Sequence, residues 1–218
     1  MCLPDELYFC VPTLQANREV EIKLRVSDLH ALICKVQDLG AGPLGRVLER
    51  NTLYDTPSAD LRSRGWLLRL RVEVPSASAW SKAGYPRTIL TSKGPWPTPI
   101  TRSGRKLPKP LYKEKIERER VLEASPRWES MLRSLGFRPG FRYEKYRTGF
   151  RLPGLHLDLD ETPIGVFLEL EGPFRLIDRA ANLLGYSSQD YLRETYWDLY
   201  SADCRRRRVS PRSMVFHT

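Results

Sequence analysis

Charged and apolar residues alternate strictly in the stretch Glu19-Val20-Glu21-Ile22-Lys23-Leu24-Arg25-Val26. A period of two predicts a β-strand, and it places the two glutamates, the lysine and the arginine on one face. Carboxylates on such a face can hold a hard metal ion, and cations can hold phosphate oxygens. The stretch therefore indicates either a solvated strand surface or part of a binding site.

The same alternation recurs later in the chain, at residues 67–73, 113–119, 145–151, 155–160 and 167–171, while Lys93 ends another strand-like segment. Two architectures explain so many charged faces. One is an open antiparallel sheet with its polar face in water, and the other is a closed barrel with a polar interior and helices over its apolar outside. Solvated faces normally include Thr, Ser and Gln, which are nearly absent here. Burying charges is costly unless they pair or bind a ligand, so the pattern favours a barrel with a ligand inside.

The bulk composition fits one globular domain. The chain has 218 residues, of which 41% are hydrophobic and 28% are charged, so a packed core is expected. No run of about 20 apolar residues occurs, which predicts no membrane span, and residues 1–17 do not resemble a secretory signal. The scattered cysteines form no CxxC pair, so we expect reduced thiols in a cytoplasmic protein and no zinc site.

The chain is basic, with a formal net charge of +10. This charge favours a polyanionic partner, either nucleic acid or a phosphorylated small molecule. Part of it lies in the run Arg205–Arg208, which we interpret as a solvated tail, so nucleic-acid binding through this run is possible but not favoured. Helices are predicted at residues 28–39, 126–135, 174–184 and 189–200, and a Pro-rich loop at 94–110.

The charged strands also carry a family signature. Glu19-Val20-Glu21-Ile22-Lys23 resembles the ExExK motif of the CYTH superfamily, also called triphosphate tunnel metalloenzymes. Further similar segments follow in the family's order: Tyr54-Asp55-Thr56-Pro57, Gly65-Trp66-Leu67-Leu68-Arg69-Leu70-Arg71, Leu90-Thr91-Ser92-Lys93-Gly94-Pro95, Lys115-Ile116-Glu117-Arg118-Glu119, Lys145-Tyr146-Arg147, Leu159-Asp160-Glu161, Gly165-Val166-Phe167-Leu168-Glu169-Leu170-Glu171 and Thr195-Tyr196. Two positions depart from the pattern, because Lys115 stands where Arg is usual and Thr195 where Ser is usual. The histidine-aromatic start of some adenylate cyclase members is not evident.

The resemblance implies an α+β fold, in which an eight-stranded antiparallel β-barrel forms a tunnel with a charged lumen and a few helices flank it. It implies a CYTH domain over residues 18–200, containing the Pro-rich loop. An N-terminal extension at 1–17 and a basic C-terminal tail at 201–218 lie outside the pattern.

The resemblance further implies binding of a triphosphate group and of Mg2+ or Mn2+. By family match the best metal ligands are Glu19, Glu21 and Glu171, and these act in catalysis together with Lys23. Five further carboxylates are secondary and are expected to bind a second metal ion, position water or hold the cations in place: Glu117, Glu119, Asp158, Asp160 and Glu169. The residues expected to hold phosphate oxygens are Lys23, Arg25, Arg69, Arg71, Lys93, Lys115, Lys145 and Arg147.

Three functions are compatible with these motifs. The favoured one is a metal-dependent hydrolase of tripolyphosphate, thiamine triphosphate or a nucleoside triphosphate, because no nucleobase pocket is evident. The alternative is an adenylate cyclase that makes cyclic AMP and pyrophosphate from ATP. A non-catalytic protein that binds polyphosphate or RNA is the third. Tyr54 and Trp66 are interpreted as core or barrel-rim packing, and Tyr196 as packing a C-terminal helix against the barrel.

Overall fold

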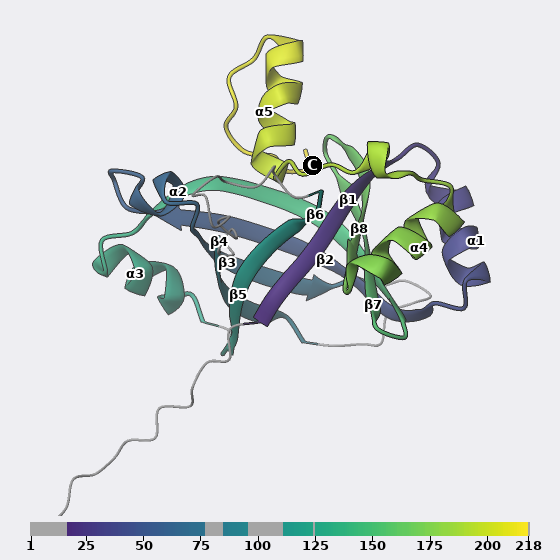
Figure 1. The fold of residues 1–218 in the computed structure, drawn as a ribbon. Helices are drawn as coiled ribbons and strands as arrows, with labels where there is room; N and C mark the ends of the chain where they lie inside the picture. The colour runs from purple at the N-terminus through teal and green to yellow at the C-terminus, as the bar shows by residue number, and fades with distance from the viewer. Residues whose placement is uncertain (1–16, 77–84, 96–110, 124, 218) are drawn as a thin grey trace, which may run out of the picture.

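The computed structural model describes residues 17–76, 85–95, 111–123 and 125–217. Eight antiparallel strands close into a barrel in the order β1-β5-β4-β3-β2-β6-β7-β8 (Figure 1). This confirms the expected α+β fold with an eight-stranded antiparallel barrel. Residues 1–16 and 96–110, which hold nearly all of the expected N-terminal extension and Pro-rich loop, lie outside the described residues.

The strands range from seven to 15 residues in length. They are β1 (Asn17–Val26), β2 (Gly42–Asp55), β3 (Leu67–Pro75), β4 (Arg87–Pro95), β5 (Lys113–Leu122), β6 (Arg138–Leu152), β7 (Leu155–Thr162) and β8 (Gly165–Glu171). The helical segments are α1 (Leu29–Asp38), α2 (Asp60–Ser63), α3 (Arg127–Ser134), α4 (Phe174–Leu184), the 3-10 turn η1 (Ser188–Asp190) and α5 (Tyr196–Arg207).

The barrel has its apolar strand faces on the outside, under helices, and its charged faces on the inside. The apolar face of β1 points outward, where Ile22 and Leu24 are buried under helix residues such as Ile177 and Leu184 in one hydrophobic cluster. Helices α1 and α4 lie side by side over this part of the barrel (Figure 1). Because side chains alternate along a strand, the charged residues of β1 must then face the lumen.

The described residues contain no helix of the length and apolar character needed to cross a membrane.

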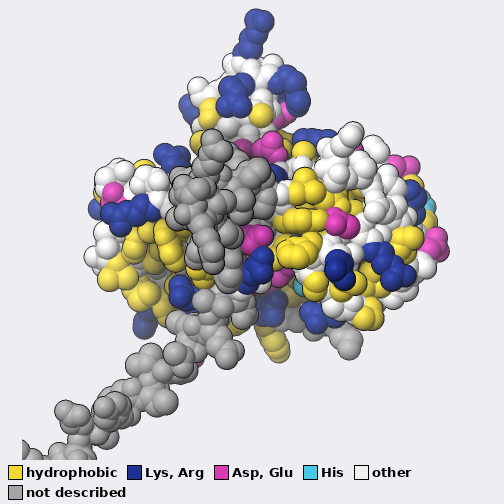
Figure 2. Space-filling view, viewed as in Figure 1, with side chains coloured by type: hydrophobic (Ala, Val, Ile, Leu, Met, Phe, Trp, Pro, Cys, Tyr) yellow, Lys and Arg dark blue, Asp and Glu magenta, His cyan; other side chains and the backbone are white. Residues whose placement is uncertain are grey.

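The C-terminal region differs from the expectation. The helix predicted at residues 189–200 begins only at Tyr196, because Thr195 and Asp198 form a capping box, and it continues to Arg207. It therefore contains most of the arginine run, and Figure 2 shows Lys and Arg side chains gathered on this projecting helix. The chain then returns to the barrel, where Met214 is buried and its backbone hydrogen-bonds to β6.

Candidate active site

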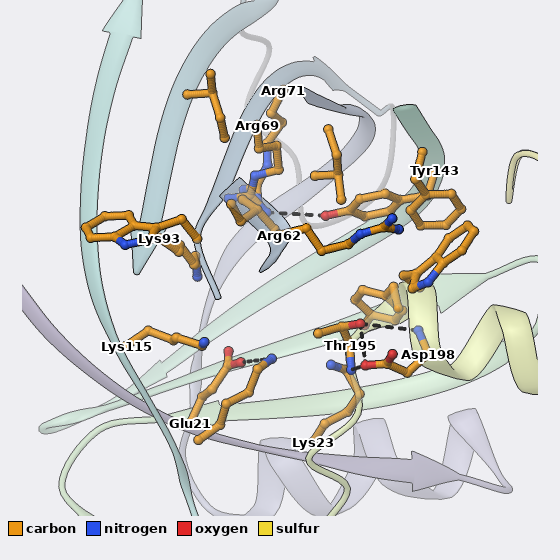
Figure 3. Close-up of a pocket in the computed structure, with 18 of the residues that line it drawn as sticks. Glu21, Lys23, Arg62, Arg69, Arg71, Lys93, Lys115, Tyr143, Thr195 and Asp198 are labelled. Atoms are coloured by element: carbon orange, nitrogen blue, oxygen red, sulfur yellow. Dashed lines mark hydrogen bonds and ion pairs between the residues drawn. The ribbon is translucent and has the colours of Figure 1, made fainter. Parts of the chain in front are cut away.

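The inward faces of the barrel enclose a cavity of about 630 Å3. This volume is within the usual range of about 300–1,000 Å3 for small-molecule sites. The charged residues that line it come from all eight strands, from α2 and α5 and from the segment after α5: Glu19, Glu21, Lys23, Asp55, Arg62, Arg69, Arg71, Lys93, Lys113, Lys115, Lys145, Arg147, His156, Asp158, Glu169, Glu171, Asp198 and Arg212. Figure 3 shows several of these side chains pointing into the same space.

Seven of the eight cations expected to hold phosphate line this cavity, and Arg25 is the exception. Its side chain is exposed, and its guanidinium carbon lies 4.8 Å from the ring centroid of Phe167. Phe167 also packs against Tyr196, which itself lines the cavity. Arg25 is thus on the charged face of β1 but beyond the aromatic residues that bound the lumen at this end.

One half of the wall, formed by β2, β3, β6 and β7, is dominated by arginines that share buried carboxylates, and we call it the arginine wall. Arg147 contacts Asp158 at 2.6 Å and Asp160 at 2.7 Å, and it also contacts Glu169 of β8. Asp160 is completely buried and accepts further hydrogen bonds from Lys145 and from the Tyr196 hydroxyl. Asp160 and Glu169 thus hold cations in place, which is one of the roles expected of the secondary carboxylates.

Glu49 of β2 is central to the arginine wall and was missed by the sequence analysis. It has no exposed surface, and it lies 3.0 Å from Arg71, 3.5 Å from Lys145 and 3.6 Å from Arg147. Burial disfavours its charged form, but the nearby Arg71 and Lys145 hold the pKa of Glu49 well below its usual range. Because side chains alternate along a strand, Glu49 and Asn51 share one face of β2 and Arg50 lies on the other. This spacing could have shown that β2 also has an inward polar face.

Asn51 completes this arrangement. Its side-chain oxygen accepts a hydrogen bond from Nε of Arg71 at 3.1 Å, and its amide donates to Glu49 at 3.4 Å. Two residues of β2 therefore hold the Arg71 guanidinium: Asn51 contacts its Nε atom and Glu49 contacts its Nη1 atom. Such fixation aligns a planar fork of donors in advance of ligand binding.

The other half of the wall, formed by β1, β4, β5 and β8, pairs carboxylates with lysines, and we call it the lysine wall. Both carboxylate oxygens of Glu19 accept hydrogen bonds from Lys93, at 2.6 and 2.8 Å. Glu21 accepts one from Lys113 at 2.6 Å. Lys115 lines the same cavity, and within the described part of the chain its ammonium has no hydrogen bond or ion pair.

Three carboxylates crowd together on the lysine wall. Glu171 lies directly opposite Glu21 in the β1–β8 ladder, and Glu19 is two residues away on the same face. Burial raises the pKa of Glu19 to about 7 despite Lys93, and Glu21 and Glu117 raise it further. The pKa of Glu171 is raised by burial and also by its carboxylate neighbours. These carboxyl groups would be stabilised in their charged form by an added cation.

The donor chemistry of this region fits a divalent cation such as Mg2+ or Mn2+, which prefers carboxylate oxygens. Glu19, Glu21 and Glu171 are the candidates that the cavity brings together. Among the described residues, no three His, Cys, Asp or Glu side chains are already arranged closely enough to hold a metal. A metal here would therefore have to replace the contacts of Glu19 and Glu21 with their lysines.

Two acidic residues of β5, Glu117 and Glu119, were also expected as secondary metal ligands. Glu117 contacts Lys93 at 3.1 Å but does not line the cavity. The side chain of Glu119 is 42% exposed, and it accepts a hydrogen bond from Thr91 at 2.7 Å. Neither Glu117 nor Glu119 lines the cavity.

The start of α5 reaches into the lumen. The capping box of Thr195 and Asp198 fixes the first turn, as the dashed lines of Figure 3 show. The ring of Tyr196 then lies 4.3 Å from the Lys23 ammonium and 5.0 Å from that of Lys145. Tyr196 therefore does more than pack the helix, since it positions two cations of the cavity by cation–π contacts.

One end of the cavity is apolar. After the charged positions, the inward faces of β2, β3 and β6 continue with Leu53, Leu67 and Phe141, and Trp66 and Trp197 complete the rim. Phe141 and Trp197 contact edge to face, with ring centroids 5.0 Å apart. We call these five residues the apolar mouth. Trp66 thus lies at the barrel rim, as expected, whereas Tyr54 is almost completely buried.

The comparisons with known proteins agree with this geometry. The family model of the CYTH domain matches residues 17–196, so the chain belongs to the CYTH family. No curated protein matches the sequence.

Solved structures with the same fold are found in distant organisms. A proposed adenylate cyclase from Vibrio parahaemolyticus is 22% identical, with a TM-score of 0.65, covering 86% of this chain and 99% of that one. The PH1819 protein of Pyrococcus horikoshii OT3 is 20% identical, with a TM-score of 0.65 and coverages of 85% and 99%. HpAC1 from Hippeastrum, a proposed adenylyl cyclase described as having a dominant triphosphatase activity, is 20% identical, with a TM-score of 0.52 and coverages of 88% and 97%. At these identities the likeness concerns the fold.

Proposed function

We propose that this protein is a metal-dependent phosphohydrolase that removes the terminal phosphate from a triphosphate-containing substrate. The observation that carries the proposal is the convergence of seven of the expected phosphate-binding cations, together with Lys113, on one cavity beside three crowded carboxylates. A linear triphosphate is a dense polyanion that such a set can surround. The membership of the CYTH family and the triphosphatase activity attributed to HpAC1 support the same reaction.

The residues divide the work of phosphoryl transfer, which depends mainly on positioning and charge stabilisation. Arg69 and Arg71 offer planar forks of donors to the phosphate oxygens, while Lys145 and Arg147 add charge at positions fixed by Glu49. Lys93 and Lys113 leave their glutamates and turn toward the phosphates as these bind. The internal ion pairs of the lysine wall are thus exchanged for pairs with substrate.

Glu19, Glu21 and Glu171 would hold Mg2+ or Mn2+. A bound divalent ion would neutralise phosphate charge and make a bound water more acidic. Lys115 lines the cavity without an internal hydrogen bond or ion pair among the described residues, so its ammonium keeps its donors for the phosphate oxygens. Lys23, held by Glu169 at 3.0 Å and by Tyr196, keeps a fixed positive charge near the reacting group.

The apolar mouth bears on what is attached to the triphosphate. A wall of Leu53, Leu67, Phe141, Trp66 and Trp197 offers no donor set for inorganic phosphate, but it can cover a planar organic group. We therefore favour an organic triphosphate, such as a nucleoside or thiamine triphosphate, over tripolyphosphate. The same mouth keeps the cyclase as a second candidate, since a cyclase must bind a nucleoside and relatives carry that name.

We further propose a cytoplasmic location. Of the described cysteines, Cys34 is an exposed free thiol and Cys204 a buried one, which suits a reducing compartment.

A substrate panel with Mg2+ or Mn2+ tests the function. Tripolyphosphate, thiamine triphosphate and ATP are supplied separately, and orthophosphate, pyrophosphate and cyclic AMP are each measured. The hydrolase gives orthophosphate, whereas pyrophosphate with cyclic AMP from ATP would establish the cyclase instead. Metal-independent binding of RNA or polyphosphate without any turnover would support the non-catalytic alternative.

Two variants connect the activity to the site. Glu19→Gln and Glu21→Gln each remove a carboxylate charge and should reduce kcat/KM by about 100-fold or more, as loss of a metal ligand or its support does. Glu114→Gln is the matched control, because Glu114 pairs with Arg18 on the outer side of the neighbouring strand. Equal activity of all three variants would contradict the assignment of the carboxylates.

A further inference from the structure

Two arginines lie at the apolar mouth that the catalytic proposal does not use. Arg62 belongs to α2, which connects β2 with β3, and Arg212 belongs to the segment that follows α5. Both line the same cavity as the phosphate-binding cations. Figure 3 shows Arg62 extending over the cavity on the side of Arg69 and Tyr143.

Both arginines differ from those of the arginine wall in having no internal partner. Each side chain is exposed, and among the described residues neither guanidinium has a hydrogen bond or ion pair. Arg71, in comparison, contacts Glu49 and Glu73. Arg62 and Arg212 therefore retain all of their donors for a ligand.

The backbone of α2 is fixed near the mouth. The carboxylate of Asp55 accepts hydrogen bonds from the backbone amides of Leu61, at 2.9 Å, and Arg62, at 3.0 Å. The Asp55 carboxylate is therefore occupied by backbone donors, and that of Asp60 accepts hydrogen bonds from the Thr56 and Ser58 hydroxyls, both at 2.7 Å. Arg62 thus starts from a defined position.

The backbone near Arg212 is fixed as well. Met214 donates its backbone N–H to the carbonyl oxygen of Arg142, at 2.9 Å, and its own carbonyl accepts from Glu144, at 2.8 Å. The Tyr200 hydroxyl donates to the carbonyl oxygen of Ser213, at 2.9 Å. These contacts hold the residues beside Arg212 against β6 and α5, so its place at the mouth is a property of the fold. The family match ends at residue 196, before this segment begins.

We propose that Arg62 and Arg212 form a second anion site, which binds a phosphate ester carried by the organic part of the substrate. The inference rests on the proposed function, because it places the triphosphate among the inner cations. The cavity lining therefore has three parts: the inner cations, the apolar mouth and these two arginines. A ligand that matches them has a triphosphate, an organic group against the mouth and a further phosphate beside it.

The shared chemistry can come from two sources. One is a mononucleotide with a 3′-phosphate, and the other is the first phosphodiester of a 5′-triphosphorylated oligonucleotide. The experiment compares ATP, adenosine 3′-phosphate 5′-triphosphate and the dinucleotide pppApA as substrates with Mg2+. For at least one substrate with the additional phosphate, the wild type should have a kcat/KM about tenfold higher than for ATP. A tenfold ratio is about what one additional charge-assisted hydrogen bond typically contributes. The substrate that gains identifies the source.

The variants test which residues create this preference. Arg62→Gln and Arg212→Gln should each lower the ratio of the two kcat/KM values, and the double variant should bring it close to one. Arg62→Lys should retain part of the preference, since it keeps the charge but loses the fork. Arg64→Gln is the control, because Arg64 is an exposed arginine at the end of the same helix that does not line the cavity. It should leave the ratio unchanged.

The possible failures are distinguishable. Equal kcat/KM for ATP and both phosphate-bearing substrates in the wild type would overturn the second anion site and leave the phosphohydrolase intact. An undiminished preference in the double variant would overturn it as well. If no substrate is turned over, dissociation constants for the three nucleotides are measured by calorimetry. Tighter binding of a phosphate-bearing nucleotide that is lost in the double variant would then support the site and refute the proposed reaction, and equal binding would refute both.

Discussion

The arginine wall and the lysine wall line one cavity with the same kinds of charge, yet they are built differently. On the arginine wall, Glu49 and Asp160 each contact several cations and have no exposed surface. On the lysine wall, Glu19 and Glu21 are held by flexible lysines. The contrast indicates that the arginine wall is a rigid scaffold that presents donors, whereas the lysine wall can exchange partners with metal and substrate.

The largest expected effect comes from breaking the arginine wall at its centre. Glu49→Gln keeps the side-chain size but leaves Arg71, Lys145 and Arg147 without their shared anion. Removing one partner of a buried ion pair typically lowers the free energy of unfolding by about 3–5 kcal/mol, because the remaining charge is uncompensated. Urea unfolding followed by circular dichroism measures the loss. A decrease of less than about 1 kcal/mol would contradict the scaffold role.

The second prediction compares an arginine, whose planar guanidinium binds two partners at once, with a lysine, whose ammonium acts as a single charge. Arg71→Lys keeps the positive charge but cannot contact Glu49, Asn51 and phosphate as a planar group, so kcat/KM should fall by about 100-fold. Lys115→Arg is the matched exchange on the lysine wall, at a position where the family usually has Arg. It should change kcat/KM by less than about threefold. Equal losses in the two variants would show that the walls do not differ in this way.

The third effect is the pH dependence of stability on the lysine wall in metal-free protein. Glu19 keeps its proton up to about pH 7 when folded, whereas the ordinary value is 4.5. Between these values the folded state binds more protons than the unfolded state, so this contribution to stability is complete below pH 4.5 and is lost as the pH rises through 7. Glu19→Gln removes it. Relative to this variant, the wild type should lose about 1–3 kcal/mol between pH 5 and 8.

Thermal unfolding of both proteins across this pH range, with chelator present, measures the difference. A constant difference between wild type and Glu19→Gln would mean that the carboxyl group is already ionised at pH 5. Glu21 provides an internal contrast, because Lys113 lowers its pKa to about 2 although burial alone would raise it. Glu21→Gln should therefore give no matching change in slope above pH 5.

The smallest effect is expected outside the cavity. Glu114 and Arg18 pair at 2.9 Å on the outer surface, where the arginine side chain is 42% exposed. Glu114→Gln should lower the free energy of unfolding by less than about 1 kcal/mol, since water screens such pairs. The value obtained by urea unfolding sets the baseline for Glu49→Gln. A loss comparable to that of Glu49→Gln would mean that burial does not govern these ion pairs.

Much of the site could be predicted because strand alternation is a local property. Alternation alone assigned Glu19, Glu21 and Lys23 to one strand face and Arg69 and Arg71 to another, and the family motif added their expected roles. Glu49 was missed because the next inward positions of β2 are the uncharged Asn51 and Leu53, so no run of charges marks this face. The apolar mouth was missed because Phe141 and Trp197 come from segments far apart in the chain and look like ordinary core residues.

The alternation of charged and apolar faces can be read directly along the chain, and in a closed barrel it places the charged faces inside. Which carboxylate meets which cation cannot be read in this way, because partners such as Glu19 and Lys93 are brought together by barrel closure. The tertiary structure also decided that Arg25 lies outside the cavity, since Phe167 and Tyr196 occupy that end. Local alternation fixes the side on which a residue points, whereas barrel closure and the packing of α5 fix what it meets there.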